Sequence, residues 1–448
     1  MEKRKISRGQ FIGTTLGLSA LASAGLKGSP LVRVMESQDR SFEMNEQIRS
    51  AYELALSILK PTKSQLEHGL ELHRNFLVFD TYGFQPTAAV DGAVIAAALK
   101  SNASPLEIQD LREDMSMTRY AENERERKEF ENAWNASGVT CVFQNCGEEG
   151  NAVERLLKRL ARFTYSTDRL KTFVCKAADP GDIVLAKKEN RHALYFSGNG
   201  VPLPQDWVSV EEELRFIRVF YQLGIRMMHL TYNRRNMIGD GCGEPSNAGL
   251  SDFGRAVVKE MNRVGVIVDI SHSGWQTSLE AAKASEKPMV ASHSCVASIN
   301  KVVRSKPDEV IKAIADTDGY IGICSIPRFL GGTGDIAALM KHIDYVAKKF
   351  GFDRVTIGTD HGYSSQYNVM ENKIISASGI RQASRTRWEA LWPDEGVFNA
   401  KPEMQESLAW TNWPLFTVGM VQMGYSDENI QKILSGNAMR VARAVLSN

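Results

Sequence analysis

Short apolar runs recur along the chain and are separated by longer segments in which apolar residues have a helical spacing. Within each run the apolar residues are contiguous instead of alternating with polar ones. This pattern is typical of strands that are covered on both faces, as in a parallel sheet. Eight such runs occur, at residues 76–80, 139–145, 193–197, 227–232, 266–272, 289–294, 320–326 and 355–360.

The segment before the fifth run shows the helical pattern most clearly. Apolar residues recur in it at steps of one, three and four residues: Leu250, Phe253, Val257, Val258 and Met261. They predict an amphipathic helix that faces the sheet. Ser251 is suited to cap its start, and Gly265 to end it. Ser426, followed by two acidic residues, predicts the start of a last helix in the same way.

Alternation of eight strands with helices predicts an α/β fold, a (β/α)8 TIM barrel. A doubly wound open sheet is the alternative. Residues 87–136 and 364–412, which follow the first and the eighth strand, are longer than simple connections require. Extended loops at this side of a barrel usually shape the substrate pocket.

The N-terminus has the features of an export signal. A basic start is followed by a mildly apolar stretch at 11–26 with small residues suited to cleavage at 20–24. Residues 7–12 resemble a twin-arginine signal with Gly9 in place of the second arginine, so the export route stays open between the twin-arginine and the general pathway. A cytosolic protein with a basic tail is the alternative.

We therefore predict three regions. Residues 1–24 form the export signal, 25–70 a leader and N-terminal helix, and 71–448 the barrel. The mature protein is expected to be periplasmic or extracellular.

Charge and composition narrow the classes of partner. Lys plus Arg number 54 and Asp plus Glu 53, which gives no electrostatic basis for binding nucleic acid or an anionic membrane. After the N-terminus no apolar run is long enough for a transmembrane span. Of six cysteines, none forms a CxxC pair, and Cys141 and Cys324 lie in strand-like runs. We expect free buried thiols and no cysteine zinc site.

Polar residues follow most of the apolar runs. In a barrel the carboxyl ends of the strands meet at one mouth, although the residues are far apart in the sequence. Two imidazoles and a carboxylate suit a zinc site, which predicts His272, His293 and Asp360 as metal ligands. The full set of such end residues is Asp80, Ser197, Tyr232, His272, His293 and Asp360.

Residues 249–272, GLSDFGRAVVKEMNRVGVIVDISH, resemble the signature of the membrane dipeptidase (renal dipeptidase) family of zinc peptidases. The similarity continues through 292–294, Arg304 with Asp308, 357–360, 424–426 and 436–437, and covers most of 75–445. It implies a (β/α)8 barrel with two zinc ions that are bridged by a carboxylate and a hydroxide. The hydroxide attacks the amide of a dipeptide, and members often form homodimers.

The resemblance also assigns roles to residues of this sequence. His272 and His293 correspond to the two histidine ligands of one zinc ion. Asp360 corresponds to the carboxylate on the other, which also transfers protons, and Arg304 to the residue that binds the substrate carboxylate. Each role suits the chemistry of its side chain.

Other positions depart from the family pattern. Tyr82 and Phe84 stand where the family has a His-x-Asp pair, Ser197 where it has the bridging glutamate, and Tyr232 where it has a substrate-facing histidine. Three protein ligands of one zinc ion are thereby lost. Because a zinc site needs about four ligands, we expect one zinc ion or none, and not two. His361 is expected to point away from the site.

We therefore expect an exported dipeptidase-family hydrolase that acts on a small peptide or amide with a free carboxylate. Asp360 and Tyr232 are the candidate catalytic residues, and Arg304, Tyr82 and Tyr232 the candidate substrate-binding residues. Two alternatives remain. One is a non-hydrolytic tailoring enzyme for a peptide natural product such as a siderophore, and the other is an inactive peptide-binding homologue.

Overall fold

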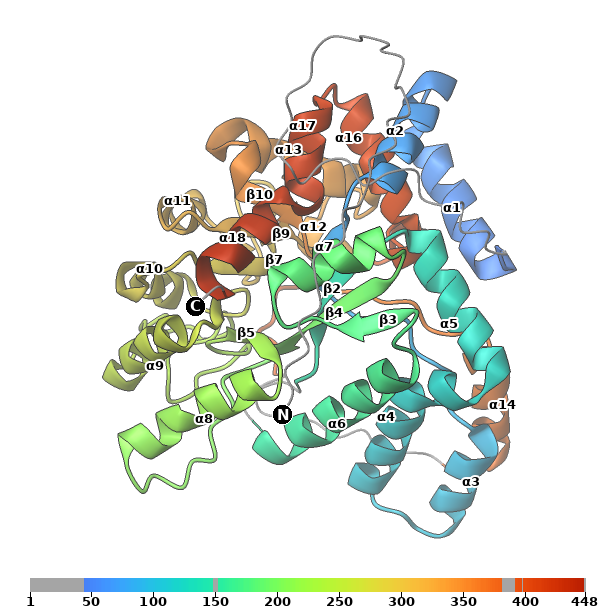
Figure 1. The fold of residues 1–448 in the computed structure, drawn as a ribbon, viewed down its shortest axis with the longest axis horizontal. Coiled ribbons are helices and arrows are strands. Elements are labelled where there is room, and N and C mark those ends of the chain that lie inside the picture. Colours follow the sequence, from blue (N-terminus) through green and yellow to red (C-terminus); the bar gives the residue numbers. More distant parts are fainter. Residues whose placement is uncertain (1–43, 148–151, 381–390, 397, 447–448) are drawn as a thin grey trace, which may run out of the picture. The chain divides into compact units, whose positions relative to one another are not determined.

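Eight parallel strands form the centre of the structure, a computed structural model that describes residues 44–147, 152–380, 391–396 and 398–446 (Figure 1). Each predicted apolar run overlaps one of these strands. In sheet order they are β1 (Phe79–Gly83), β2 (Cys141–Asn145), β4 (His192–Gly198), β5 (Ile225–His229), β6 (Ile267–Asp269), β7 (Val290–Val296), β9 (Tyr320–Ile323) and β10 (Val355–Ile357).

The sheet curves into a nearly closed barrel, whose seam lies between β1 and the segment after β10. The Asp360 amide donates to the Tyr82 carbonyl at 2.9 Å, and the Phe84 amide to the His361 carbonyl at 3.0 Å. Farther along, the Asp80 carboxylate accepts from the Thr359 amide at 2.9 Å. The prediction of a barrel is confirmed, and the open-sheet alternative is wrong.

Two short strands lie outside this order and were not predicted. β3 (Val174–Lys176) pairs with β4, and β8 (Ser305–Lys306) pairs with β7. Strands of two or three residues are too short to leave an apolar pattern in the sequence. β8 follows Arg304 directly, so its pairing with β7 positions that side chain.

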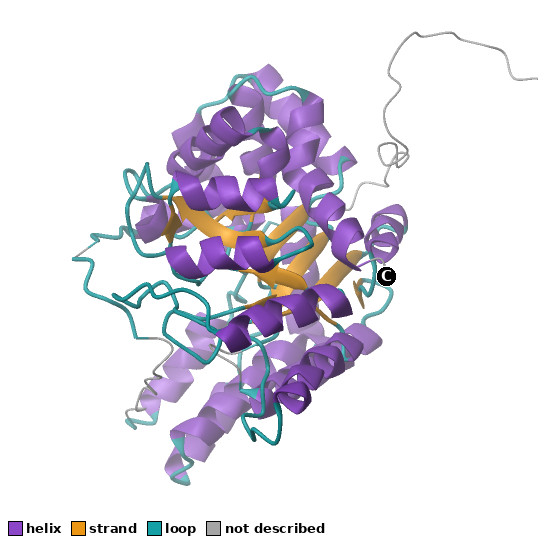
Figure 2. Ribbon diagram, turned by 90° about the vertical axis from the view of Figure 1, so that its left-hand side faces the viewer, coloured by secondary structure: helices purple, strands orange, loops and turns teal. Residues whose placement is uncertain are grey.

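Helices surround the strands, as the two views together show (Figures 1 and 2). Their bounds are α1 Glu46–Leu59, α2 Lys63–Asn75, α3 Gly92–Lys100, α4 Pro105–Glu122, α5 Glu124–Ser137, α6 Val153–Arg169, α7 Pro180–Lys188, α8 Val210–Gln222, α9 Asp252–Val264, α10 Trp275–Ala284, α11 Asp308–Asp316, α12 Pro327–Leu330, α13 Ile336–Phe350, α14 Asn368–Ala377, α15 Pro402–Ser407, α16 Trp413–Gln422, α17 Asp427–Gln431 and α18 Asn437–Leu446.

The predicted helix ends are confirmed. The Ser251 hydroxyl accepts from the Gly254 amide at the start of α9, and Gly265 ends the helix with φ of 90°. Ser426 caps α17 through the Asn429 amide.

The two long connections are more helical than expected. Residues 87–136 contain α3, α4 and most of α5, and the second connection contains α14 and α15. A small apolar cluster, formed by Val90, Ile95, Leu99, Ile108 and Ile375, packs α3 and α4 against α14. The two insertions therefore support each other, and α3 and α14 lie side by side in Figure 1.

The lower part of the barrel is filled by aromatic and aliphatic side chains. Phe79 stacks on Phe143 with ring centroids 5.3 Å apart, and Tyr195 adjoins Phe143 at 5.1 Å. Apolar residues of α18, among them Met439 and Val441, join the same buried cluster. A packed floor of this kind leaves polar chemistry to the mouth.

Other expectations from composition can also be compared with the structure. All six cysteines are free, and Cys141 and Cys324 are buried as predicted. Within the described ranges no helix is long and apolar enough to cross a membrane.

Residues 1–24 lie outside the described residues, and the predicted boundary at 70/71 falls within α2 and stays a prediction.

The packed floor generates a stability prediction. Phe143→Ala should lower the free energy of unfolding by about 3–5 kcal/mol because it leaves a cavity among buried rings. Val208→Ala is the control, because Val208 is 82% exposed and its truncation should cost less than about 0.5 kcal/mol. Urea unfolding followed by circular dichroism measures both, and equal midpoints would contradict the assignment of the floor.

Candidate active site

Three histidines gather at the carboxyl ends of neighbouring strands. His229 ends β5, His272 follows β6 and His293 lies in β7. Their ring centroids are 5.1–5.3 Å apart in every pair. The structure thus brings together the predicted pair, His272 and His293, and adds a third imidazole that the sequence analysis missed.

His272 and His293 approach each other through Nε2 atoms that are 3.1 Å apart. His272 Nδ1 lies 2.8 Å from Asn233 Oδ1, an acceptor, and therefore carries the hydrogen. His293 Nδ1 lies 2.9 Å from Ser292 Oγ, whose own hydrogen goes to Asp269, so this nitrogen also donates. In the neutral state both Nε2 atoms then hold lone pairs that face each other.

Two facing lone pairs fit a shared cation. Zinc–nitrogen bonds of about 2.0–2.1 Å place two tetrahedral ligands about 3.3 Å apart, close to the separation found here. Burial and the nearby charge of Arg304 hold the pKa of both imidazoles well below the usual value, which disfavours a proton between them. The residues present therefore fit one zinc ion.

Aromatic rings cover the imidazoles. Tyr82 stacks on His293 with centroids 3.9 Å apart, and Tyr232 stacks on His272 at 4.1 Å. Phe84 meets the edge of Tyr82 at 6.2 Å. Burial, and secondly the charge of Asp360, raise the pKa of both tyrosines, so neither is a phenolate ligand at neutral pH.

Asp360 lies at the seam with a left-handed backbone, φ of 56°, and is half-buried. Burial raises the pKa of its carboxyl group to about 6. The positive charges of Arg304 and of protonated His229 lower the pKa and offset part of this effect. A left-handed aspartate is uncommon and is tolerated where the surrounding structure requires it. The hydrogen bond from its amide to the Tyr82 carbonyl places Asp360 beside the residue whose ring stacks on His293.

Arg304 is 1% exposed and is directed at the backbone. Its guanidinium donates to the carbonyls of Ser271 and His293 and lies over the Phe329 ring, 5.5 Å from the centroid. It therefore joins the turn that carries His272 to strand β7, which carries His293. A guanidinium has five N–H donors, so two such bonds still leave donors for a substrate carboxylate.

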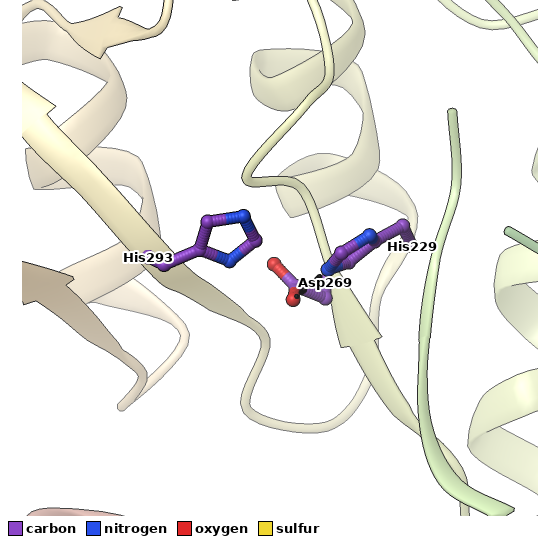
Figure 3. A group of neighbouring side chains, drawn as sticks. All are labelled: His229, Asp269 and His293. Carbon is purple, nitrogen blue, oxygen red and sulfur yellow. Dashed lines mark ion pairs between the residues drawn. The ribbon is translucent and has the colours of Figure 1, made fainter. Parts of the chain in front are cut away.

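A buried carboxylate, Asp269, lies beneath the pair and was also missed. It accepts from the amide and hydroxyl of both Ser271 and Ser292, and its Oδ2 is 2.7 Å from His229 Nε2 (Figure 3). Burial alone would raise the pKa of Asp269, but His229 in its protonated form and the hydroxyl groups of Ser292 and Ser271 lower it to about 2. Charged and titratable residues inside apolar runs were the available signal, because such groups are rarely buried without a partner.

His361 points away from the imidazoles, as expected. Its Nε2 lies 2.6 Å from Gln405 Nε2, so the side chain contacts Gln405. It takes no part in the site.

Comparisons with known proteins agree with this picture. The family described as membrane dipeptidase (peptidase family M19) matches residues 87–374. Dipeptidase tcpJ of Claviceps purpurea (strain 20.1) is 28% identical over 234 residues, which are 51% of this chain and 47% of that protein. Dipeptidase verJ of Clonostachys rogersoniana is 26% identical over 232 residues, 51% of this chain and 50% of that protein. The chain thus spans about half the length of the curated relatives it matches.

Solved structures share the fold at low sequence identity. An amidohydrolase from Pseudomonas aeruginosa has a TM-score of 0.59 and 22% identity, over 85% of this chain and 99% of that one. A metallo peptidase from Rhodobacter sphaeroides, liganded with a phosphinate mimic of the dipeptide L-Ala-D-Ala, has a TM-score of 0.55 and 14% identity, over 83% and 99%. Because the family match extends over more than half of the 448 residues, the chain belongs to the membrane dipeptidase family.

Proposed function

We propose that this protein hydrolyses a dipeptide, or a small peptide or amide with a free carboxylate, with at most one bound zinc ion. The observation that carries the proposal is the convergence of the His272 and His293 Nε2 atoms at 3.1 Å. Arg304 donates to the His293 carbonyl, and the Asp360 amide donates to the carbonyl of Tyr82, whose ring stacks on His293. The dipeptidase names of its relatives, and the dipeptide mimic bound to the Rhodobacter sphaeroides enzyme, support a peptide substrate.

The roles follow from the chemistry of each side chain. His272 and His293 would hold the ion, with Asp360 as a third ligand or as the group that moves a proton, and the ion supplies Lewis-acid polarisation of the amide carbonyl. The Arg304 guanidinium binds the substrate carboxylate beside Tyr82. Tyr232, protonated at neutral pH, donates its hydroxyl hydrogen to the oxygen that becomes negative during attack.

We also propose that the protein is exported. The basic start, the mildly apolar stretch at 11–26 and the small residues at 20–24 support this proposal.

Hydrolysis is tested first with a panel of dipeptides and their C-terminal amides, followed by mass spectrometry with and without added zinc. We expect free amino acids from the dipeptides and at least about 10-fold slower cleavage of the amides, which lack the charge that Arg304 binds. His272→Gln should abolish cleavage, whereas His68→Gln, a change at an exposed histidine, should not. A product other than hydrolysed peptide would instead indicate a tailoring reaction, and binding without turnover a receptor.

Tyr232 provides a second test. Tyr232→Phe keeps the ring on His272 but removes the hydroxyl, so kcat should fall about 100-fold with the unfolding midpoint unchanged. Tyr165→Phe, at an exposed tyrosine, is the matched control and should leave kcat unchanged. An unaltered kcat in the Tyr232 variant would remove this residue from the catalytic set.

Export is tested by expressing the full chain and a variant that lacks residues 1–24 in a Gram-negative host. The full chain should be found in the periplasmic fraction, shortened at its N-terminus as shown by intact mass, and the truncated variant in the cytosol. Retention of the full, uncleaved chain in the cytosol would contradict export.

A further inference from the structure

Beneath the mouth lies a second group of ligand-type atoms, formed by His229, Asp269 and His293. They come from the three neighbouring strands β5, β6 and β7, and His229 and Asp269 are direct partners in the parallel ladder. One nitrogen or oxygen atom from each lies within 4.8 Å of the others, and all three residues are 0% exposed. Figure 3 shows the three side chains turned toward one another.

The contact between His229 and Asp269 is short, but its direction is poor for a hydrogen bond. Nε2 lies 2.7 Å from Oδ2, yet Nε2 has no hydrogen-bond partner with acceptable direction in the described part of the chain. The other nitrogen, Nδ1, lies 2.6 Å from Asn199 Oδ1 and therefore carries the hydrogen. A neutral His229 thus presents a lone pair to a carboxylate oxygen, an arrangement that is repulsive unless a cation lies next to both atoms.

A protonated His229 is the competing explanation. An imidazolium would donate along its N–H bond, and the direction of this contact is poor for such a bond. No Lys or Arg in the described ranges forms an ion pair with Asp269, so the carboxylate also lacks a fixed cationic partner there. Both observations favour a bound cation at this position.

We propose that His229, Asp269 and one nitrogen of His293 form an inner site for a divalent cation of the zinc class. Two imidazole nitrogens and one carboxylate oxygen are ligands that zinc and cobalt accept, whereas calcium and magnesium prefer oxygen alone. The inner site shares only His293 with the facing pair at the mouth. At the mouth His293 would use the Nε2 lone pair while Nδ1 carries the hydrogen, so the ring serves an ion at one of the two sites at a time. The inner site goes beyond the proposed function, because that function requires an ion only at the mouth. It rests on the proposed function only through His293, the residue that both sites share.

The test uses the full chain, stripped of metal with a chelator and titrated with Co²⁺, whose visible absorption reports nitrogen and oxygen ligands. His229→Gln should weaken the binding of this ion by about 100-fold or more, because loss of even an outer-shell partner typically costs 10–100-fold. His272→Gln removes a ligand of the mouth only and should leave the inner ion bound. His68→Gln is the surface control and should match the wild type.

A crystal of the cobalt-loaded protein locates the ion directly by anomalous scattering. A peak within bonding distance of His229 and Asp269 supports the inner site, even if the His229 variant folds poorly. A peak only between His272 and His293, with unchanged binding in His229→Gln, overturns it and leaves the proposed function intact. Absence of bound cobalt in the wild type also overturns it, while hydrolysis of dipeptides decides the proposed function separately.

Discussion

The site depends on one buried carboxylate, that of Asp269. It accepts the amide and hydroxyl hydrogens of Ser271 and Ser292, the residues directly before His272 and His293. Hydrogen bonds to a charged acceptor are worth about 1.5–3 kcal/mol each, and a buried carboxylate without them would be strongly destabilising. A single anion therefore sets the backbone position of both imidazoles.

Arg304, a cation, supports the same backbone segments as the Asp269 carboxylate. It donates to the carbonyls of Ser271 and His293. The two segments that carry the imidazoles are therefore bound by an anion at their N–H groups and by a cation at their C=O groups. With the backbone held on both sides, Asn233 and Ser292 need only select the ring tautomers. The result is a pair of Nε2 atoms oriented in advance toward one point, as a metal site requires.

The frame and the site have changed to different extents relative to other family members. TM-scores of 0.55–0.59 accompany sequence identities of only 14–22% among the solved structures compared. The packed floor of the barrel and α18 consist mostly of residues away from the mouth, so residues at the mouth can change without loss of the fold. Here Tyr82 and Tyr232 cover the imidazoles at positions where the resemblance to the family implies histidines, and this supports the proposal of at most one ion.

The sequence by itself determined the eight strands, the ends of α9 and the start of α17, because contiguous apolar runs and capping residues act locally. It also determined the family, through residues 249–272, and the candidates His272 and His293. Only the tertiary structure decided that His229 and Asp269 join them, that Arg304 is directed at backbone carbonyls, and that the two long insertions pack on each other. The reason is geometric: strand tilt and register bring together residues that are far apart along the chain, such as Tyr82 and His293, and the local pattern does not encode that register.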